Sequence, residues 1–309
     1  MRDLDRRSLL AATAAAALLP QAARAQSAMM RAAPILKRRV PQTGYMLPIV
    51  GIGTSQVFEF ENDPAKLEER KTVVRNLVAG GGSLIDTAAS YGTAEANVGL
   101  VSEQTGLRDR LFLATKYTSR ISHADAEASL KRSLQRLKTD HVDLQQAHNV
   151  GDPNFSCAQM KDWKAKGLCK HYGITSSFDS AYEALAPVLR REKPEFFQIN
   201  YSLGDRGAET VLLPLARDNG CAVLTNLPFG RNSMFKKVAG KPIPDWAREI
   251  GCTSFAQIFL KYNLSHPAVT AVIPGTDKPQ YMLDNLNAGR GPMPDAAFRR
   301  RIEQWWDTV

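Results

Sequence analysis

The chain has 309 residues, a formal net charge of +9 at pH 7 and four cysteines. Its basic residues form short runs only at 37–39 and 299–301, so the dense positive face of a nucleic-acid-binding protein is not expected. The cysteines lie far apart without a C-x-x-C pair, and no His, Asp and Glu cluster has metal-ligand spacing. We therefore expect neither a nucleic-acid partner nor a metal site.

The first 25 residues have the pattern of an export signal. Arg6 and Arg7 precede an apolar run at 9–19, and Ala23 and Ala25 form a small-residue cleavage site. The run is shorter than the ~20 residues that a membrane-spanning helix needs. The paired arginines favour the twin-arginine route, although an ordinary secretory signal with two chance arginines has the same outline.

These features predict how the chain is divided and where it goes. We expect residues 1–25 to be a signal peptide of the twin-arginine type and residues 26–309 to form one mature domain. The partner of the signal is then the twin-arginine export machinery. The protein would bind its cofactor before export, become periplasmic or otherwise exported, and have no stable membrane insertion after cleavage.

The rest of the chain alternates between short apolar runs and longer stretches with helical spacing. Residues 37–40 and 45–47 flank a turn at 42–44 and predict a β-hairpin. Strands are then expected at 49–53, 83–86, 111–116, 142–148, 170–175, 196–200, 222–225 and 269–273. Helices are expected between them, for example at 66–79, 124–138, 180–191, 210–219 and 254–262. Eight alternations over this length predict an α/β fold, a closed (β/α)₈ TIM barrel whose bottom is closed by the hairpin.

Four polar side chains fall at or just after the ends of adjacent predicted strands, where the chemistry of such barrels takes place. Asp86 ends the second strand, and Tyr91 lies in the loop that follows it. Lys116 ends the third strand and His148 ends the fourth. We therefore expect a carboxylate, a phenol, an amine and an imidazole to converge at one mouth.

Together these groups suit the reduction of a carbonyl. A hydride added at the carbon leaves negative charge on the oxygen, which must then receive a proton. Tyr91 can donate it, and a nearby Lys116 ammonium lowers the phenol pKa, which is ordinarily ~10. Asp86 can hold the lysine charged, while a neutral His148 can donate a hydrogen bond that orients the carbonyl oxygen.

At these residues the sequence resembles the aldo-keto reductase superfamily. Residues 84–95, continuing to Gly99, are similar to its signature, and 113–116 and 142–149 resemble its lysine and histidine motifs. The resemblance continues in order as far as Asn285, over nearly the whole mature chain. It implies an NAD(P)H-dependent oxidoreductase in which the phenol is the proton donor, the lysine and aspartate tune it, and the histidine orients the carbonyl. Together with the signal peptide, we expect an exported bacterial member of this superfamily.

By the same resemblance, a nicotinamide cofactor binds at the later strand ends. Thr175, Ser176 and Gln198 stand where the carboxamide is hydrogen-bonded, and their polar groups suit that contact. Ser176 replaces the usual asparagine, and Asn226 replaces the aromatic ring that usually stacks on the nicotinamide. These two departures leave the affinity and orientation of the cofactor open.

Further cofactor contacts are expected at the rim. Thr54, in a Gly-Ile-Gly-Thr segment, and Asp86 belong to the implied set. Arg231, in the loop that follows Asn226, is expected to contact the pyrophosphate because a guanidinium matches phosphate oxygens.

The choice between the two nicotinamide cofactors depends on the last predicted site. Gly275, Thr276, Lys278 and Asn285 lie in a segment that resembles the adenosine-phosphate motif. Lys278 makes NADP(H) the expected cofactor over NAD(H), although Asp277 beside it opposes a 2′-phosphate.

We therefore expect reduction of an aldehyde or ketone to an alcohol, with a small-molecule carbonyl substrate. The alternative is a cofactor-holding binding or regulatory barrel with little turnover, with which Asn226 is compatible, but the four catalytic-type residues favour the enzyme. Loop 57–61, the loop after His148 and the tail with Trp305 and Trp306 are expected to form the substrate pocket. Packing of the tail on the barrel explains the two tryptophans equally well.

Overall fold

The computed structural model describes residues 33–309, so the predicted signal peptide lies outside the described part of the chain. Eight parallel strands form one sheet, in the order of the sequence. They are β3 (Ile52–Gly53), β4 (Leu84–Asp86), β5 (Phe112–Thr118), β6 (Val142–His148), β7 (Cys169–Ser176), β8 (Phe196–Asn200), β9 (Ala222–Asn226) and β10 (Val269–Val272). Parallel bridges from Val50 to Val272 and from Gly53 to Gly275 close the sheet into a barrel. The predicted (β/α)₈ barrel is thereby confirmed.

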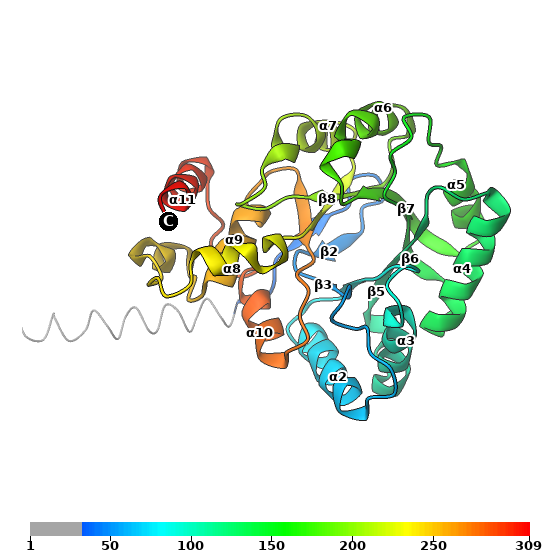
Figure 1. Ribbon diagram of the computed structural model, residues 1–309, viewed down its shortest axis with the longest axis horizontal. Coiled ribbons are helices and arrows are strands. Elements are labelled where there is room, and N and C mark those ends of the chain that lie inside the picture. Colours follow the sequence, from blue (N-terminus) through cyan, green and yellow to red (C-terminus); the bar gives the residue numbers. More distant parts are fainter. Residues whose placement is uncertain (1–32) are drawn as a thin grey trace, which may run out of the picture.

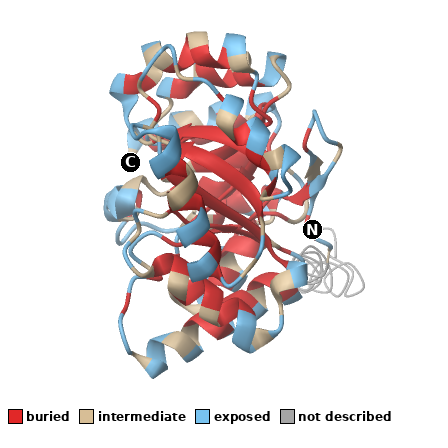
Figure 2. Cartoon of the chain, turned by 90° about the vertical axis from the view of Figure 1, so that its right-hand side faces the viewer, coloured by how far each residue is buried: buried red, intermediate tan, exposed pale blue. Residues whose placement is uncertain are grey.

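Helices surround the barrel (Figure 1). They are α2 (Pro64–Ala79), α3 (Ala94–Thr105), α4 (His123–Leu137), α5 (Ala158–Ala165), α6 (Tyr182–Glu192), α7 (Leu212–Asp218), α8 (Ser233–Lys237), α9 (Phe255–Leu264), α10 (Pro279–Asn287) and α11 (Ala296–Thr308). Several begin at a side-chain cap: the Ser122 hydroxyl accepts from the Asp125 amide at the start of α4, and Ser254 does the same at α9. The strands are buried, whereas the helices keep exposed outer faces (Figure 2).

The N-terminal hairpin closes the bottom of the barrel, as predicted. Its strands β1 (Lys37–Arg39) and β2 (Met46–Pro48) pair antiparallel. Val40 and Leu47 of the hairpin belong to the same buried cluster as the first inward-facing residues of the barrel strands. The Tyr45 ring lies 5.3 Å from that of Phe112, centroid to centroid, at the start of β5.

The character of the interior changes along the strands. Side chains two residues apart on a strand share a face, and on β5 and β6 this row runs from apolar to polar. Phe112 and Leu144 lie in the apolar cluster near the bottom, whereas Lys116 and His148 line the cavity at the other end. The apolar residues therefore hold the barrel together below, and the polar residues are presented at its mouth.

The tail packs on the outside of the barrel. Trp306 of α11 is buried and makes an edge-to-face contact with Phe259 of α9 at 5.6 Å between centroids, and Trp305 stacks on Phe255 at 6.0 Å. Neither tryptophan lines the cavity at the mouth. Of the two explanations that the sequence leaves open, packing of the tail is the one found.

Candidate functional site

A cavity of about 400 Å³ opens at the carboxyl ends of the strands. All four side chains expected to carry the chemistry line it, and they come from β4, the loop after β4, β5 and β6. The full lining is Gly53, Thr54, Ser55, Gln56, Val57, Asp86, Tyr91, Lys116, His148, Asn149, Thr175, Ser177, Gln198, Asn226, Leu227, Pro228, Phe229, Arg231, Asn232, Ile273 and Gly275.

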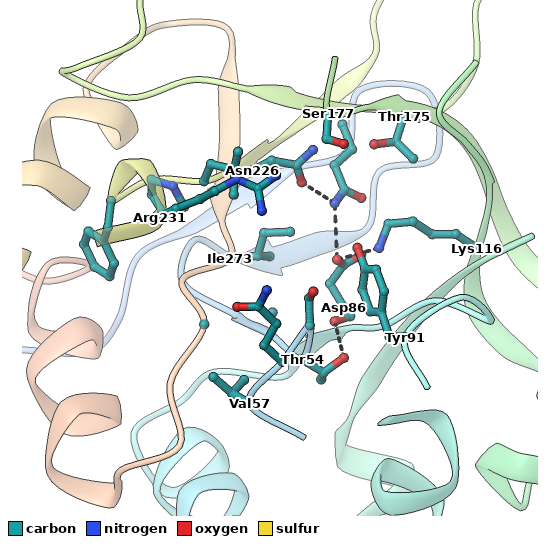
Figure 3. A pocket seen from close by; sticks show the side chains of 18 of the residues that line it. Thr54, Val57, Asp86, Tyr91, Lys116, Thr175, Ser177, Asn226, Arg231 and Ile273 are labelled. Atoms are coloured by element: carbon teal, nitrogen blue, oxygen red, sulfur yellow. Dashed lines mark hydrogen bonds and ion pairs between the residues drawn. The ribbon is translucent and has the colours of Figure 1, made fainter. Parts of the chain in front are cut away.

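Lys116 and Asp86 form a buried ion pair at the base of this cavity (Figure 3). The Lys116 Nζ lies 2.6 Å from Asp86 Oδ2 and also donates to the Thr87 carbonyl at 2.7 Å. Their side chains are 1% and 3% exposed. Desolvation lowers the pKa of Lys116, but the nearby Asp86 and Tyr91 outweigh it, so the net pKa is raised and the ammonium is retained.

Tyr91 lies beside this pair. The Lys116 Nζ is 5.2 Å from the centroid of the Tyr91 ring. Burial raises the pKa of Tyr91, and Lys116 acts in the opposite direction without cancelling the effect. Lys116 thus lowers the pKa of Tyr91, as expected. The predicted net lowering is wrong, because desolvation raises this pKa by more than Lys116 lowers it. A phenol with a raised pKa stays protonated at neutral pH and so remains able to donate.

His148 lies next to Tyr91 in the cavity lining. The two rings meet edge to face with centroids 5.7 Å apart, and the Ser90 hydroxyl lies 3.3 Å from His148 Nδ1, which leaves Nε2 for the cavity. Burial, together with the Lys116 ammonium, lowers the pKa of His148 to about 3. The imidazole is therefore neutral at physiological pH, as the sequence led us to expect.

Asp86 also anchors a chain of side-chain amides that crosses the barrel. Gln146 Nε2 donates to Gln198 Oε1 at 2.7 Å and lies 3.4 Å from Asp86 Oδ1. Gln198 Nε2 donates to Asp86 Oδ2 at 3.2 Å and to Asn226 Oδ1 at 2.5 Å. An ionised carboxylate only accepts, so it orients each amide in turn. The Asn226 Nδ2 points away from Gln198 and makes one long contact of 3.4 Å to the Ser176 carbonyl.

The end of β7 places alternate side chains on opposite faces. Thr175 and Ser177 line the cavity, whereas Ser176 is fully buried and its hydroxyl accepts from the Phe178 amide at 3.2 Å. The structure thus brings Thr175 and Gln198 into the cavity as expected, but Ser177 takes the place expected of Ser176. The period-2 alternation of a strand is the signal that could have identified Ser177, because it lies two positions after Thr175.

The loop after β9 forms the rim. Arg231 lines the cavity there, and three of the loop's non-glycine residues, Leu227, Arg231 and Asn232, have positive φ angles of 48°, 51° and 71°. Such angles are uncommon outside glycine and store backbone strain. Elsewhere at the mouth, Thr54 is held to the end of β4, because its amide and hydroxyl both donate to the Asp86 carbonyl, at 3.0 and 3.1 Å.

Of the four cofactor residues predicted in the segment 275–285, three lie outside the cavity lining. Gly275 lines the cavity, but Thr276, Lys278 and Asn285 do not. Thr276 accepts from the Lys278 amide at 3.2 Å, and Asn285 is buried on α10.

Lys278 is already paired in this structure. Its Nζ donates to Glu69 Oε1 of α2 at 2.9 Å and lies 3.8 Å from Asp277. Its charge is therefore shared with two carboxylates rather than presented alone.

Sequence reasoning did not identify the polar lining residues Ser55, Gln56, Ser177 and Asn232, nor Gln146, which bonds to Gln198. Asn149 belongs to the loop after His148, which was expected to contribute to the pocket. Gln146 precedes His148 by two positions on β6, so its inward direction follows from strand alternation. In loop 57–61, which was expected to contribute to the substrate pocket, only Val57 lines the cavity, because Phe58 and Phe60 are buried in the protein. Over residues 33–309 there is neither a cluster of potential metal ligands nor a helix long and apolar enough to cross a membrane.

The polar groups of the cavity suit a nicotinamide dinucleotide. The Thr175 hydroxyl and the amides of Gln198 and Asn226 lie together, and the Asn226 Nδ2 retains bonding capacity for a carboxamide. Arg231 at the rim supplies a cation suited to phosphate oxygens.

The chain is similar to known reductases over most of its length. Residues 49–305 match the profile of the aldo/keto reductase family. A methylglyoxal reductase of Escherichia coli is 31% identical over 237 residues, which are 73% of this chain and 80% of that protein. A methylglyoxal reductase of Yersinia pestis is 29% identical over 252 residues, 78% of this chain and 87% of that protein. An aldo-keto reductase of Klebsiella pneumoniae, solved with NADPH, has the same fold, with a TM-score of 0.73 and 23% identity over 89% of this chain and 95% of that chain.

Proposed function

The chain belongs to the aldo/keto reductase family and is an NAD(P)H-dependent carbonyl reductase, and we propose that Tyr91 is the proton donor of its reaction. The observation that carries this assignment is the convergence of Tyr91, His148 and the Lys116–Asp86 pair on one cavity. The alternative of a binding barrel without turnover is not favoured, because binding alone does not require a buried ion pair beside a protonated phenol.

A nicotinamide cofactor, when bound, would supply the hydride. Thr175, Gln198 and Asn226 would hold its carboxamide, and Arg231 would hold its phosphate oxygens. His148, neutral and with Nε2 facing the cavity, donates a hydrogen bond that positions the carbonyl oxygen. Tyr91 then gives its hydroxyl proton to that oxygen as negative charge develops on it. The Lys116 ammonium stabilises the phenolate that remains.

We propose small aldehydes and ketones as substrates and NADPH as the reductant. The names of the Escherichia coli and Yersinia pestis relatives make methylglyoxal a suitable first substrate. NADPH is supported by Lys278, although its pairing with Glu69 reduces the charge available to a 2′-phosphate. Lys278→Ala should weaken binding of NADPH and leave that of NADH unchanged in a fluorescence titration. An equal effect on both cofactors would remove this reason for preferring NADPH.

Single-turnover oxidation of bound NADPH tests the catalytic assignment. Tyr91→Phe removes one hydroxyl, so the fold and the cofactor affinity should survive, while hydride transfer slows by ~10²-fold or more. Tyr45→Phe is a matched control, because Tyr45 is exposed on the hairpin at the bottom of the barrel and does not line the cavity. Equal rates for wild type and Tyr91→Phe would show that another group donates the proton.

We also propose export by the twin-arginine route, to the periplasm or beyond, with the cofactor bound first. The support is the Arg6-Arg7 pair ahead of a short apolar run. Replacing both arginines with lysine should leave a folded, cofactor-competent precursor in the cytoplasm, whereas Arg24→Lys should not. Normal export of the double variant, measured by cell fractionation, would rule out this route.

A further inference from the structure

Asn149 lies beside the catalytic histidine and has an unused donor. It follows His148 directly at the end of β6 and lines the same cavity. Its backbone has a positive φ of 55°, a conformation that asparagine adopts more readily than most residues. The Asn149 backbone carbonyl accepts a hydrogen bond from the Ser119 hydroxyl at 3.2 Å. The backbone amide of the next residue, Val150, donates to the Thr175 backbone carbonyl at 3.0 Å. The position of the residue is therefore fixed from both sides.

The orientation of the Asn149 amide follows from its partner. The Ser177 backbone N–H donates to Asn149 Oδ1 at 3.0 Å, and the Ser177 hydroxyl lies 3.2 Å from the same oxygen. A backbone N–H can only donate, so the side-chain atom facing it must be the oxygen. The Nδ2 group faces the other way, and it donates no hydrogen bond to any residue within 33–309.

We propose that Asn149 is a specificity residue that donates from Nδ2 to a second oxygen, carried by the carbon next to the reacting carbonyl. This inference rests on the proposed function, because Tyr91 and His148 define where the first oxygen lies. Asn149 has a positive φ and so departs from the strand alternation that would turn its side chain away from that of His148. Both residues line the same cavity, so the two donors His148 and Asn149 suit two neighbouring oxygens. The favoured substrates are then 2-oxoaldehydes and 2-hydroxyaldehydes.

The same geometry disfavours simple alkyl aldehydes. A substrate without the second oxygen covers the Asn149 donor and leaves it without a partner, and such an unpaired polar group is what allows a site to reject an analogue. Elsewhere in the lining, Val57 and Ile273 offer only apolar contacts. A discrimination of about tenfold or more in kcat/KM is expected from one such hydrogen bond.

Methylglyoxal and propanal provide the test, because they share a three-carbon chain and differ in the oxygen at the second carbon. The quantity to compare is the ratio of their kcat/KM values in wild type and in variants, so that the intrinsic reactivity of the two aldehydes cancels. Asn149→Asp keeps the oxygen that Ser177 needs and removes the donor. Asn149→Gly removes the whole amide and tolerates the positive φ. Asn154→Leu, exposed in the same loop and outside the cavity lining, is the control.

We expect the ratio to fall about tenfold in both Asn149 variants and to stay constant in Asn154→Leu. Equilibrium binding of hydroxyacetone against 1-propanol should show the same loss without turnover. An unchanged ratio in both Asn149 variants, with propanal still reduced, would overturn the role of Asn149 and leave the proposed function intact. Absence of any carbonyl reduction by wild type would overturn both.

Discussion

Replacing Lys116 with methionine should separate the structural role of the buried ion pair from its catalytic role. Lys116 Nζ and Asp86 Oδ2 are 2.6 Å apart, and both side chains are almost fully removed from solvent. Removing the cation leaves a buried carboxylate without its partner, which destabilises a protein by about 3–5 kcal/mol. For a domain of this size, we expect Tm to fall by about 10 °C.

A second substitution tells the two roles apart. In Lys116→Met/Asp86→Asn no charge is buried, so most of the lost stability should return. Hydride transfer should stay slow in both variants, because Tyr91 no longer has an ammonium beside it. Differential scanning calorimetry and single-turnover oxidation of NADPH measure the two properties separately.

The stability deficit of Lys116→Met should also depend on pH. Burial raises the pKa of Asp86, and Lys116 opposes that shift, so the raised value increases further once the lysine is gone. A carboxyl whose pKa is higher in the folded than in the unfolded state favours folding at low pH and loses that advantage as the pH rises. The deficit should therefore be smaller at pH 5 than at pH 8. An unchanged Tm in Lys116→Met, or a double variant no more stable than the single one, would refute this reasoning.

Three other residues, His148, Glu69 and Gly99, allow further tests. Because the pKa of His148 is lowered to about 3, its protonation should produce no inflection in the rate between pH 8 and 5.5, and an inflection near 6.5 would contradict a neutral imidazole. In the unfolded state His148 takes up a proton below its ordinary pKa of ~6.5, whereas in the folded state it stays neutral. The free energy of unfolding should therefore decrease as the pH falls from about 6.5 toward 3. Glu69→Gln should release Lys278 and tighten binding of NADPH but not of NADH in a fluorescence titration at low salt; no change would mean that Lys278 does not reach the cofactor. Gly99→Ala should destabilise the fold by several kcal/mol in calorimetry, because a Cβ there would clash with the Arg136 carbonyl where α3 packs on α4. A loss of free energy of unfolding below ~0.5 kcal/mol would show that the two helices separate easily.

The sequence was sufficient for the barrel and for the convergence of its four polar side chains. The ranges predicted for two strands, 142–148 and 196–200, are those observed for β6 and β8. Once eight alternations indicate a closed barrel, topology alone brings the strand ends together, so Asp86, Lys116 and His148 meet without any knowledge of packing.

What the sequence did not reveal depends on contacts between distant elements. Gln146 links Asp86 to Gln198, and the linkage requires the angular positions of three strands around the barrel. The partner of Lys278 is Glu69, 209 positions away on α2, which no local pattern indicates. The net direction of the Tyr91 pKa was missed for a related reason: it depends on how much solvent the surrounding loops exclude.

The position of the hairpin at the bottom of the barrel also determines how the protein can be fused to another protein or immobilised on a surface. The chain reaches Ala33 beside Arg290 and then pairs Leu36 with Gly289, at the end of the barrel remote from the mouth. A fluorescent protein, an affinity handle or a solid support joined ahead of Ala33 would therefore face away from the cavity. Immobilised in this way, the barrel would keep its mouth open to substrate and would be oriented uniformly, which suits surface-based measurement of cofactor and carbonyl binding.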